Sequence, residues 1–253
     1  MSEISLALSG GAARGAYHLG ALQYIDDNDI KIKAICGTSI GSIIGTSYAA
    51  GVSPRKQLEI FKSKEFREIF SFNFFHNSIF SINSKAAILE QLMPINNLEE
   101  LSIPVCFSAV DLNTGEELFF SQGKLPEICL ASSALIPMFE PVKYNGLILG
   151  DGGLINHMPI KPLLEHPYPI VGINLHPLTV SHKQNNIYNF IKRAIYLKTY
   201  SNSGDSQSKC DIFITNDKLR NYSLFSLKHL DEMFTMGYRD AESLLDIYDT
   251  MPN

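Results

Sequence analysis

Two glycine-rich turns, each placed directly after a short apolar run, constrain the fold of this chain more than any other feature. Residues 4–8 (ISLAL) lead into Ser-Gly-Gly-Ala-Ala-Arg-Gly at 9–15, and residues 32–36 (IKAIC) lead into Gly-Thr-Ser-Ile-Gly at 37–41. Short apolar runs that stop at glycine are typical of buried strands. Apolar residues at helical spacing follow each turn, so the sequence predicts the unit strand–turn–helix twice in succession.

The same alternation of strands and helices continues to the end of the chain. Further strands are predicted at 104–110, 116–121, 142–149 around a turn at Asn145-Gly146, 169–174 and 211–215. Further helices are predicted at 84–93, 124–133, 187–200 and 227–247, and a polar loop at 201–209. Alternating strands and helices predict an α/β layered domain with a largely parallel sheet. A length of 253 residues without a Pro-, Gly- or Ser-rich linker predicts one domain over residues 1–253.

Composition limits the classes of partner. The chain is 45% hydrophobic and 19% charged, with a net charge of −5, so nothing indicates a nucleic-acid partner. A mild acidic excess leaves a peripheral contact with a membrane open, because a local patch can provide it. The sequence does not indicate an oligomeric state.

Cellular location is predicted from the cysteines and the N-terminus. The four cysteines lack C-x-x-C spacing, and most lie in apolar surroundings, which favours free buried thiols in a reducing compartment. The N-terminal residues read as a strand rather than a signal peptide, and no apolar run is long enough to span a bilayer. We expect a cytoplasmic protein, with export by a signal-less route left open.

The turn at 37–41 matches the pattern G-x-S-x-G in the context that this pattern requires. A serine at a sharp strand-to-helix turn is pushed out of the backbone surface, and the flanking Gly37 and Gly41 leave room for the neighbouring chain. The following helix directs its positive dipole end toward the reaction centre. Ser39 is therefore the candidate nucleophile, against the alternative of a purely structural turn.

The turn at 9–15 brings backbone N–H groups close to any ligand, and three interpretations compete for it. One is an oxyanion hole, which a nucleophilic serine needs. The second is a dinucleotide fingerprint, but Ala12 stands where its middle glycine belongs, and the second strand ends in Cys36-Gly37 rather than in an acidic residue. The third is a tight turn without a ligand.

A third glycine cluster follows the strand predicted to end at residue 149. Asp151 lies between Gly150 and the pair Gly152 and Gly153, so its carboxylate can sit in a cleft with little steric cover. Taken alone, Asp-Gly is also an ordinary turn.

The three clusters in this order resemble the patatin-like phospholipase family. The resemblance rests on SGGAARG at 9–15, GTSIG at 37–41 and DGG at 151–153. The block Ala131–Pro137 is similar to the A-S-x-x-x-P stretch of that family, and Gly237-Tyr238 with Ala241 is similar to its closing helix. The resemblance covers nearly the whole chain and implies a three-layer α/β/α fold with a mostly parallel central sheet.

The resemblance also implies an activity and a site. It implies a phospholipase A or lysophospholipase type of lipid acyl hydrolase with a Ser39–Asp151 catalytic dyad, no metal and no cofactor, and lipid or phospholipid acyl esters as substrates. The backbone amides of Gly10, Gly11 and Ala12 would form the oxyanion hole. The supporting motif residues are Arg14, Gly15, Gly37, Gly41, Gly152 and Gly153. Arg14 either braces the loop or meets a lipid phosphate.

Several alternatives stay open at this point. A Ser-His-Asp triad could be filled by Ser39, Asp151 and His176, although only one strand precedes the strand of the serine. His157 either lines the cleft or is structural. The phenylalanine-rich stretch 66–80 either forms a flap for lipid or packs the domain. The chain could also be a catalytically weak lipid-binding regulator on the same fold, or an acyltransferase.

Overall fold

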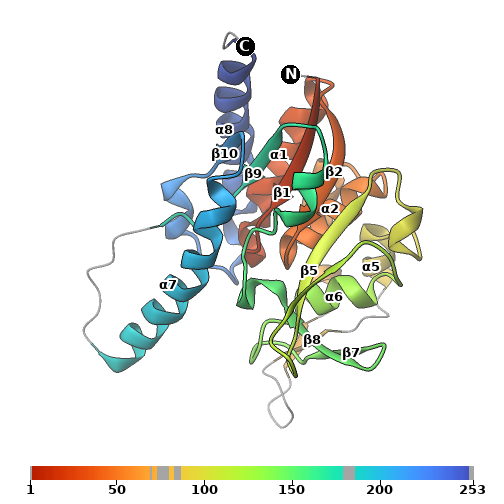
Figure 1. The fold of residues 1–253 in the computed structure, drawn as a ribbon, viewed down its shortest axis with the longest axis vertical. Coiled ribbons are helices and arrows are strands. Elements are labelled where there is room, and N and C mark those ends of the chain that lie inside the picture. The colour runs from red at the N-terminus through yellow and green to blue at the C-terminus, as the bar shows by residue number, and fades with distance from the viewer. Residues whose placement is uncertain (1, 69, 73–79, 83–86, 179–185, 251–253) are drawn as a thin grey trace.

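A seven-membered run of strands forms the centre of the protein (Figure 1). The structure, a computed structural model, describes residues 2–68, 70–72, 80–82, 87–178 and 186–250. The strand order is β10-β9-β1-β2-β5-β8-β7, and β6 also pairs with β5. The strands of this sheet are β1 (Glu3–Leu8), β2 (Lys31–Gly37), β5 (Val105–Asp111), β6 (Glu117–Phe120), β7 (Val142–Tyr144), β8 (Leu147–Asp151), β9 (Ile170–Ile173) and β10 (Ile212–Ile214).

The pairing of neighbouring strands is parallel from β10 to β5 and antiparallel beyond it. The parallel pairs are β10–β9, β9–β1, β1–β2 and β2–β5, whereas β6 and β8 run antiparallel to β5. The predicted mostly parallel sheet is thus confirmed. A separate hairpin joins β3 (Phe70–Phe72) to β4 (Phe80–Ile82).

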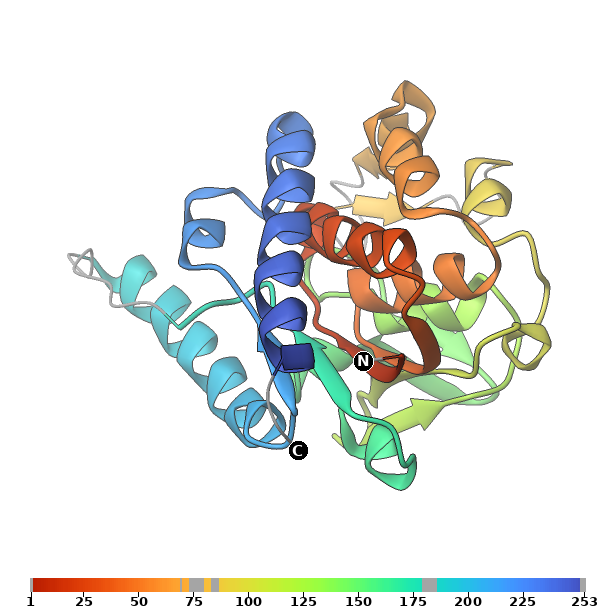
Figure 2. The ribbon, with the colours of Figure 1, turned by 90° about the horizontal axis from the view of Figure 1, so that it is seen from above.

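Helices cover both faces of the sheet and complete a three-layer α/β/α fold (Figures 1 and 2). The helices are α1 (Gly15–Asp27), α2 (Ile40–Ala49), α3 (Pro54–Lys62), α4 (Lys64–Glu68), α5 (Ala87–Leu92), α6 (Glu127–Ser132), α7 (Ile187–Gln207) and α8 (Leu230–Thr250). Helix α3 begins at Pro54, and the Ser53 hydroxyl caps it by accepting a hydrogen bond from the N–H of Lys56 at 3.3 Å.

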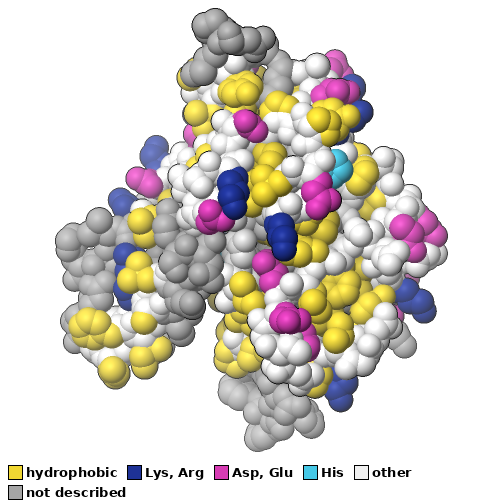
Figure 3. Space-filling view, viewed as in Figure 1, with side chains coloured by type: hydrophobic (Ala, Val, Ile, Leu, Met, Phe, Trp, Pro, Cys, Tyr) yellow, Lys and Arg dark blue, Asp and Glu magenta, His cyan; other side chains and the backbone are white. Residues whose placement is uncertain are grey.

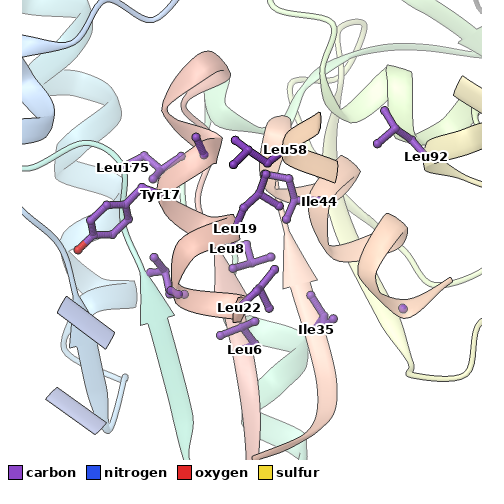
Figure 4. Packing of buried hydrophobic residues seen from close by; sticks show 14 of the residues in the cluster. Leu6, Leu8, Tyr17, Leu19, Leu22, Ile35, Ile44, Leu58, Leu92 and Leu175 are labelled. Atoms are coloured by element: carbon purple, nitrogen blue, oxygen red, sulfur yellow. The ribbon is translucent and has the colours of Figure 1, made fainter. Parts of the chain in front are cut away.

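Burial on both faces of the sheet explains why β1 consists almost entirely of apolar residues. Leu6 and Leu8 point to the face that carries α1 and α2, where they pack with Leu19, Leu22 and Ile44 (Figure 4). Ala7 points to the opposite face and joins a second cluster that includes Met158, Ile160 and Leu163. Because both faces of the strand are buried, every position has to be small or apolar.

Helices α1 and α8 pack together closely through two glycines, which explains the glycine of the closing helix. A Cβ atom at Gly20 would overlap the carbonyl oxygen of Phe234, and a Cβ atom at Gly237 would overlap that of Tyr17. The Tyr17 hydroxyl also donates a hydrogen bond to Asp240 at 2.6 Å. The last helix is therefore an integral part of the layer that contains α1.

One predicted element is wrong and one lies partly outside the described residues. Residues 201–207 continue α7 instead of forming a loop, although Ser, Asn and Gly have low helix propensity. The buried Ser206 side chain accepts a hydrogen bond from Asn156 at 3.2 Å, so tertiary contact holds this end of the helix. Of the stretch 66–80, residues 69 and 73–79 lie outside the described residues, while Phe66 is buried against Phe61.

The cysteines agree with the predicted free thiols. All four are unbridged; Cys36 and Cys129 are buried, whereas Cys106 and Cys210 are half-buried.

Candidate active site

The turn after β2 holds Ser39 in a strained backbone conformation. Ser39 has φ 53° and ψ −125°, a backbone conformation that residues other than glycine rarely adopt. A Cβ atom at Gly37 would lie 2.7 Å from the backbone of Gly41, and one at Gly41 would overlap the carbonyl oxygen of Leu8. Both glycines are thus needed for β2, α2 and β1 to approach one another, and the strained serine is presented above them.

Strand β5 brings Ser39 and Asp151 together across 112 positions of sequence. Gly37 pairs with Phe107 of β5, and Asp151 pairs with Ala109 two residues further on. Strand β6 occupies the other edge of β5 along residues 107–110, so β2 and β8 lie end to end along the same edge. The two strands approach Ser108 from opposite directions, and their ends deliver the serine and the aspartate to one point.

Asp151 is buried but carries a hydrogen bond to the candidate nucleophile. Its carboxylate accepts a hydrogen bond from the N–H of Gly153 at 2.7 Å and forms a second one with the Ser39 side chain. Burial raises the pKa of Asp151 from 3.8 to about 6, and the two hydrogen bonds oppose that shift. A carboxylate held in this way is a stronger base than an exposed one and is still ionised at neutral pH.

The loop after β1 presents two backbone N–H groups beside this pair. Gly10 lies against Ser39, but its N–H already donates to the carbonyl oxygen of His157 at 3.0 Å. The N–H groups of Gly11 and Ala12 have no hydrogen-bond partner within the described part of the chain. Of the three predicted oxyanion donors, the geometry therefore leaves Gly11 and Ala12 available.

The conformation of this loop also explains its composition. Gly11 has φ 154°, and a Cβ atom there would lie 2.7 Å from the side chain of Leu175. Ala12 has φ 49°, the left-handed conformation that glycine adopts without cost and alanine at about 1 kcal/mol. Ala12 thus holds a backbone conformation that a glycine would also adopt.

Arg14 acts as a brace for the loop. Its Nε and Nη2 atoms donate to the carbonyl oxygen of Tyr222 at 3.1 and 2.9 Å, and Nη1 donates to that of Leu175 at 3.1 Å. The guanidinium group therefore ties the loop after β1 to the segments after β9 and β10. This arrangement corresponds to the bracing alternative.

The remaining motif glycines allow close packing around the site. A Cβ atom at Gly15 would lie 2.6 Å from the Ile40 side chain, and one at Gly152 would overlap Ser108. A Cβ atom at Gly153 would lie 3.0 Å both from the Asp151 carboxylate and from Nδ1 of His157. These three positions let α1, the loop after β8 and His157 converge on Ser39 and Asp151.

Three hydroxyl side chains support the turn, and the sequence reasoning assigned no role to them. The N–H of Ser39 donates to both the carbonyl oxygen and the hydroxyl oxygen of Ser132, each at 3.1 Å. The Ser132 hydroxyl donates to the carbonyl oxygen of Ser108 at 2.7 Å, and the Ser108 hydroxyl bonds that of Thr38. The sequence signal for Ser132 was the small-residue block 131–137, which contains it.

The histidines near the site form a group of their own. His176 stacks on His157 with ring centroids 4.6 Å apart, and His18 bonds the carbonyl oxygen of Ser9 at 2.9 Å. Burial lowers the pKa of His157 and of His18 to about 4, so both rings are neutral at pH 7. Asp151 bonds Ser39 directly, whereas the alternative triad would place the His176 ring between them.

No group of three or more His, Cys, Asp or Glu among the described residues is arranged to hold a metal ion. None of the helices drawn in colour in Figure 1 is both long enough and apolar enough to cross a bilayer.

Two curated proteins show how far the sequence similarity extends. An uncharacterised NTE family protein of Mycobacterium tuberculosis is 31% identical over 168 residues, which is 64% of this chain and 45% of that protein. Lysophospholipase NTE1 of Cryptococcus neoformans is 28% identical over 170 residues, covering 65% of this chain and 10% of that protein. The chain thus spans less than half the length of these curated relatives.

A structure and a family model extend the comparison. The crystal structure of VipD from Legionella pneumophila matches with a TM-score of 0.57 at 15% identity, covering 98% of this chain and 67% of that one, which shows a shared fold. The model of the patatin-like phospholipase family matches residues 6–164, a segment that begins within β1 and contains the glycine loop, the Ser39 turn and Asp151. The chain belongs to the patatin-like phospholipase family.

Proposed function

We propose that this protein is a lipid acyl hydrolase of the phospholipase A or lysophospholipase type, with Ser39 as nucleophile and Asp151 as base. The observation that carries the proposal is the hydrogen bond between Ser39 and a buried carboxylate whose pKa is about 6. Membership in the patatin-like phospholipase family and a relative named as a lysophospholipase support the substrate class.

Acylation of the enzyme follows from the positions of these groups. Ser39 Oγ attacks the ester carbonyl carbon while Asp151 accepts the hydroxyl proton. The negative charge that develops on the carbonyl oxygen is stabilised by the N–H groups of Gly11 and Ala12. The C–O bond of the ester then breaks, and the leaving alcohol or lysolipid takes the proton from Asp151.

Deacylation reverses these roles with water as the second substrate. Asp151 accepts a proton from water, whose oxygen attacks the acyl carbon on Ser39, and the same two amides stabilise the second oxyanion. Cleavage of the bond to Ser39 Oγ releases the fatty acid, and the proton on Asp151 returns to the serine. No histidine, metal or cofactor takes part in this scheme.

We also propose that residues 1–253 work as a single unit. Helix α8 lies beyond the segment that the family model matches, yet its Gly237 packs directly against α1, which begins at the end of the glycine loop. Removing α8 would expose the apolar face of α1 and disturb the loop that holds the oxyanion donors.

The test is hydrolysis of a lipid panel by the wild type, Ser39→Ala and Asp151→Asn. The panel contains phosphatidylcholine, lysophosphatidylcholine and triacylglycerol, with a soluble p-nitrophenyl ester alongside. We expect fatty acid release by the wild type and a loss of at least about 10³-fold in both variants. Matched controls are Ser47→Ala on α2 and Asp111→Asn at the end of β5, which are buried residues of the same types.

Covalent labelling gives a second readout. A fluorophosphonate probe should add its mass to the wild type and not to Ser39→Ala. A folded wild type that releases no fatty acid and resists the probe would favour the lipid-binding regulator. Acyl transfer to an added alcohol in place of hydrolysis would favour the acyltransferase.

A further inference from the structure

Helix α7 presents an unusual run of exposed apolar side chains. Ile187, Phe190 and Ile191 are 74%, 55% and 53% exposed, and Leu197 is 43% exposed. Together with the exposed Ala194, their spacing of three and four residues places them on one side of the helix. Figure 3 shows apolar surface on the arm that α7 forms at the lower left. An apolar stripe of this kind marks an interaction surface.

The stripe lies at the same end of the protein as the candidate active site. Helix α7 connects β9 to β10, which run parallel, so it runs back against the direction of the strands. Its first turns therefore lie toward the carboxyl ends of the strands, where Ser39 and the glycine loop are placed (Figure 1). The far end of α7 is held to the body of the protein by Ser206.

Three more exposed apolar side chains lie close to site residues along the chain. Leu154 follows Asp151 by three positions and is 38% exposed, and Leu178 follows His176 by two and is 51% exposed. Phe225, 56% exposed, comes directly after Leu224, whose carbonyl oxygen accepts the N–H of Ala13. The apolar surface of α7 is thus accompanied by apolar side chains around the site.

Charge distinguishes this part of the chain from the rest. The protein carries a net charge of −5, yet no Asp or Glu occurs between Glu165 and Asp205. The same interval contains four basic residues: Lys183, Lys192, Arg193 and Lys198. A stretch of sequence with basic and no acidic residues that also forms an apolar helical face is typical of segments that bind anionic lipid surfaces.

We propose that the apolar face of α7 binds an anionic lipid bilayer and directs the Ser39 edge of the sheet toward it. A second copy of this chain is a poorer occupant, because residues 166–204 of both copies would carry basic residues and no acidic ones. Membrane binding itself does not depend on catalysis; delivery of lipid to Ser39 rests on the proposed function.

The test uses the full chain with Ser39→Ala, so that the vesicles stay intact. Sedimentation is measured with vesicles of phosphatidylcholine and phosphatidylserine, and with phosphatidylcholine alone. We expect stronger binding to the anionic vesicles, and weakening by about tenfold or more in the double variant Phe190→Ser/Ile191→Ser. Lys192→Ser should weaken binding to anionic vesicles by about fivefold and leave binding to neutral ones unchanged.

The matched control is Leu164→Ser. Leu164 is also an exposed leucine, 48% exposed, but it precedes β9 and so lies toward the opposite end of the sheet. This variant should bind vesicles as the parent does. Circular dichroism of all variants checks that they are folded. We expect them to fold, because the substituted side chains are exposed.

Three outcomes would overturn the proposal. They are failure of the folded parent to bind anionic vesicles, equal binding by the Phe190→Ser/Ile191→Ser variant, and a stable dimer that this variant converts to a monomer. Hydrolysis of a soluble p-nitrophenyl ester, measured with Ser39 intact, keeps the two proposals apart. If the Phe190→Ser/Ile191→Ser variant loses vesicle binding but keeps its ester turnover, the result supports membrane binding by α7. If the parent and all variants fail to hydrolyse the ester, the result contradicts only the proposed catalytic dyad.

Discussion

Replacing Asp151 with asparagine tests whether the candidate base is held at a cost in stability. Burial raises the pKa of this carboxyl from 3.8 to about 6, so ionised Asp151 is less stable in the folded protein than in the unfolded chain. Asparagine has nearly the same shape, and its carbonyl oxygen can still accept the N–H of Gly153. The substitution therefore removes the charge and keeps the packing.

The size of the expected change in unfolding free energy follows from the linkage between protonation and folding. Between the two pKa values the folded state binds more protons than the unfolded state, so the wild type loses stability as pH rises through this window. A shift of about two units corresponds to about 3 kcal/mol, lost in full only above about pH 6. The Asp151→Asn protein lacks this loss, and we expect its advantage over the wild type to grow by about 2 kcal/mol from about pH 4 to about pH 7.5.

The assay is urea unfolding of both proteins at these two pH values, with catalytic activity measured in parallel. Asp29→Asn serves as the control, because the Asp29 side chain is 94% exposed and its replacement should leave stability unchanged at both pH values. A stability difference between wild type and Asp151→Asn that does not change with pH would refute the argument. So would an Asp151→Asn protein that keeps full esterase activity.

Three other predictions concern the pH profile, the support of the nucleophile turn and the helix contact. Because Asp151 must be ionised to accept a proton, kcat/KM should fall about tenfold per pH unit below about pH 6, and a flat profile would exclude it as the base. Ser132→Ala removes one of two acceptors of the Ser39 N–H, and should lower kcat about fivefold with KM and folding unchanged. Gly237→Ala should lower unfolding free energy by about 2 kcal/mol in thermal denaturation, because its Cβ overlaps a backbone oxygen of Tyr17. Gly204→Ala, with open space around it, should be neutral or slightly stabilising in the same assay.

Most strands and helices were predicted because their causes are local. Apolar runs that lead into glycine-rich turns indicated β1 and β2, the apolar run at 169–174 indicated β9, and the pair Asn145-Gly146 marked the turn between β7 and β8. The last third of α7, residues 201–207, was mispredicted because its residues are poor helix formers. The contact between Ser206 and Asn156, fifty positions apart, supports that end, and local sequence carries no trace of it.

The candidate site was also predicted only in part. The chain order of the three glycine clusters indicated the family, the candidate nucleophile and its candidate base. Sequence reasoning also proposed three oxyanion donors, but whether an N–H is available depends on its partner in space. The carbonyl oxygen of His157 takes the N–H of Gly10, so two donors are left.

The sequence by itself determined most of the segments that become strands and turns, because apolar runs and glycine-rich turns are properties of the local chain. Only the tertiary structure decided which side chains these turns bring together. Strand β5 offers one edge to both β2 and β8, and this places a carboxylate beside a hydroxyl 112 positions away and buries it enough to raise its pKa. Burial and electrostatic environment are set by atoms from the whole fold, and no local pattern contains them.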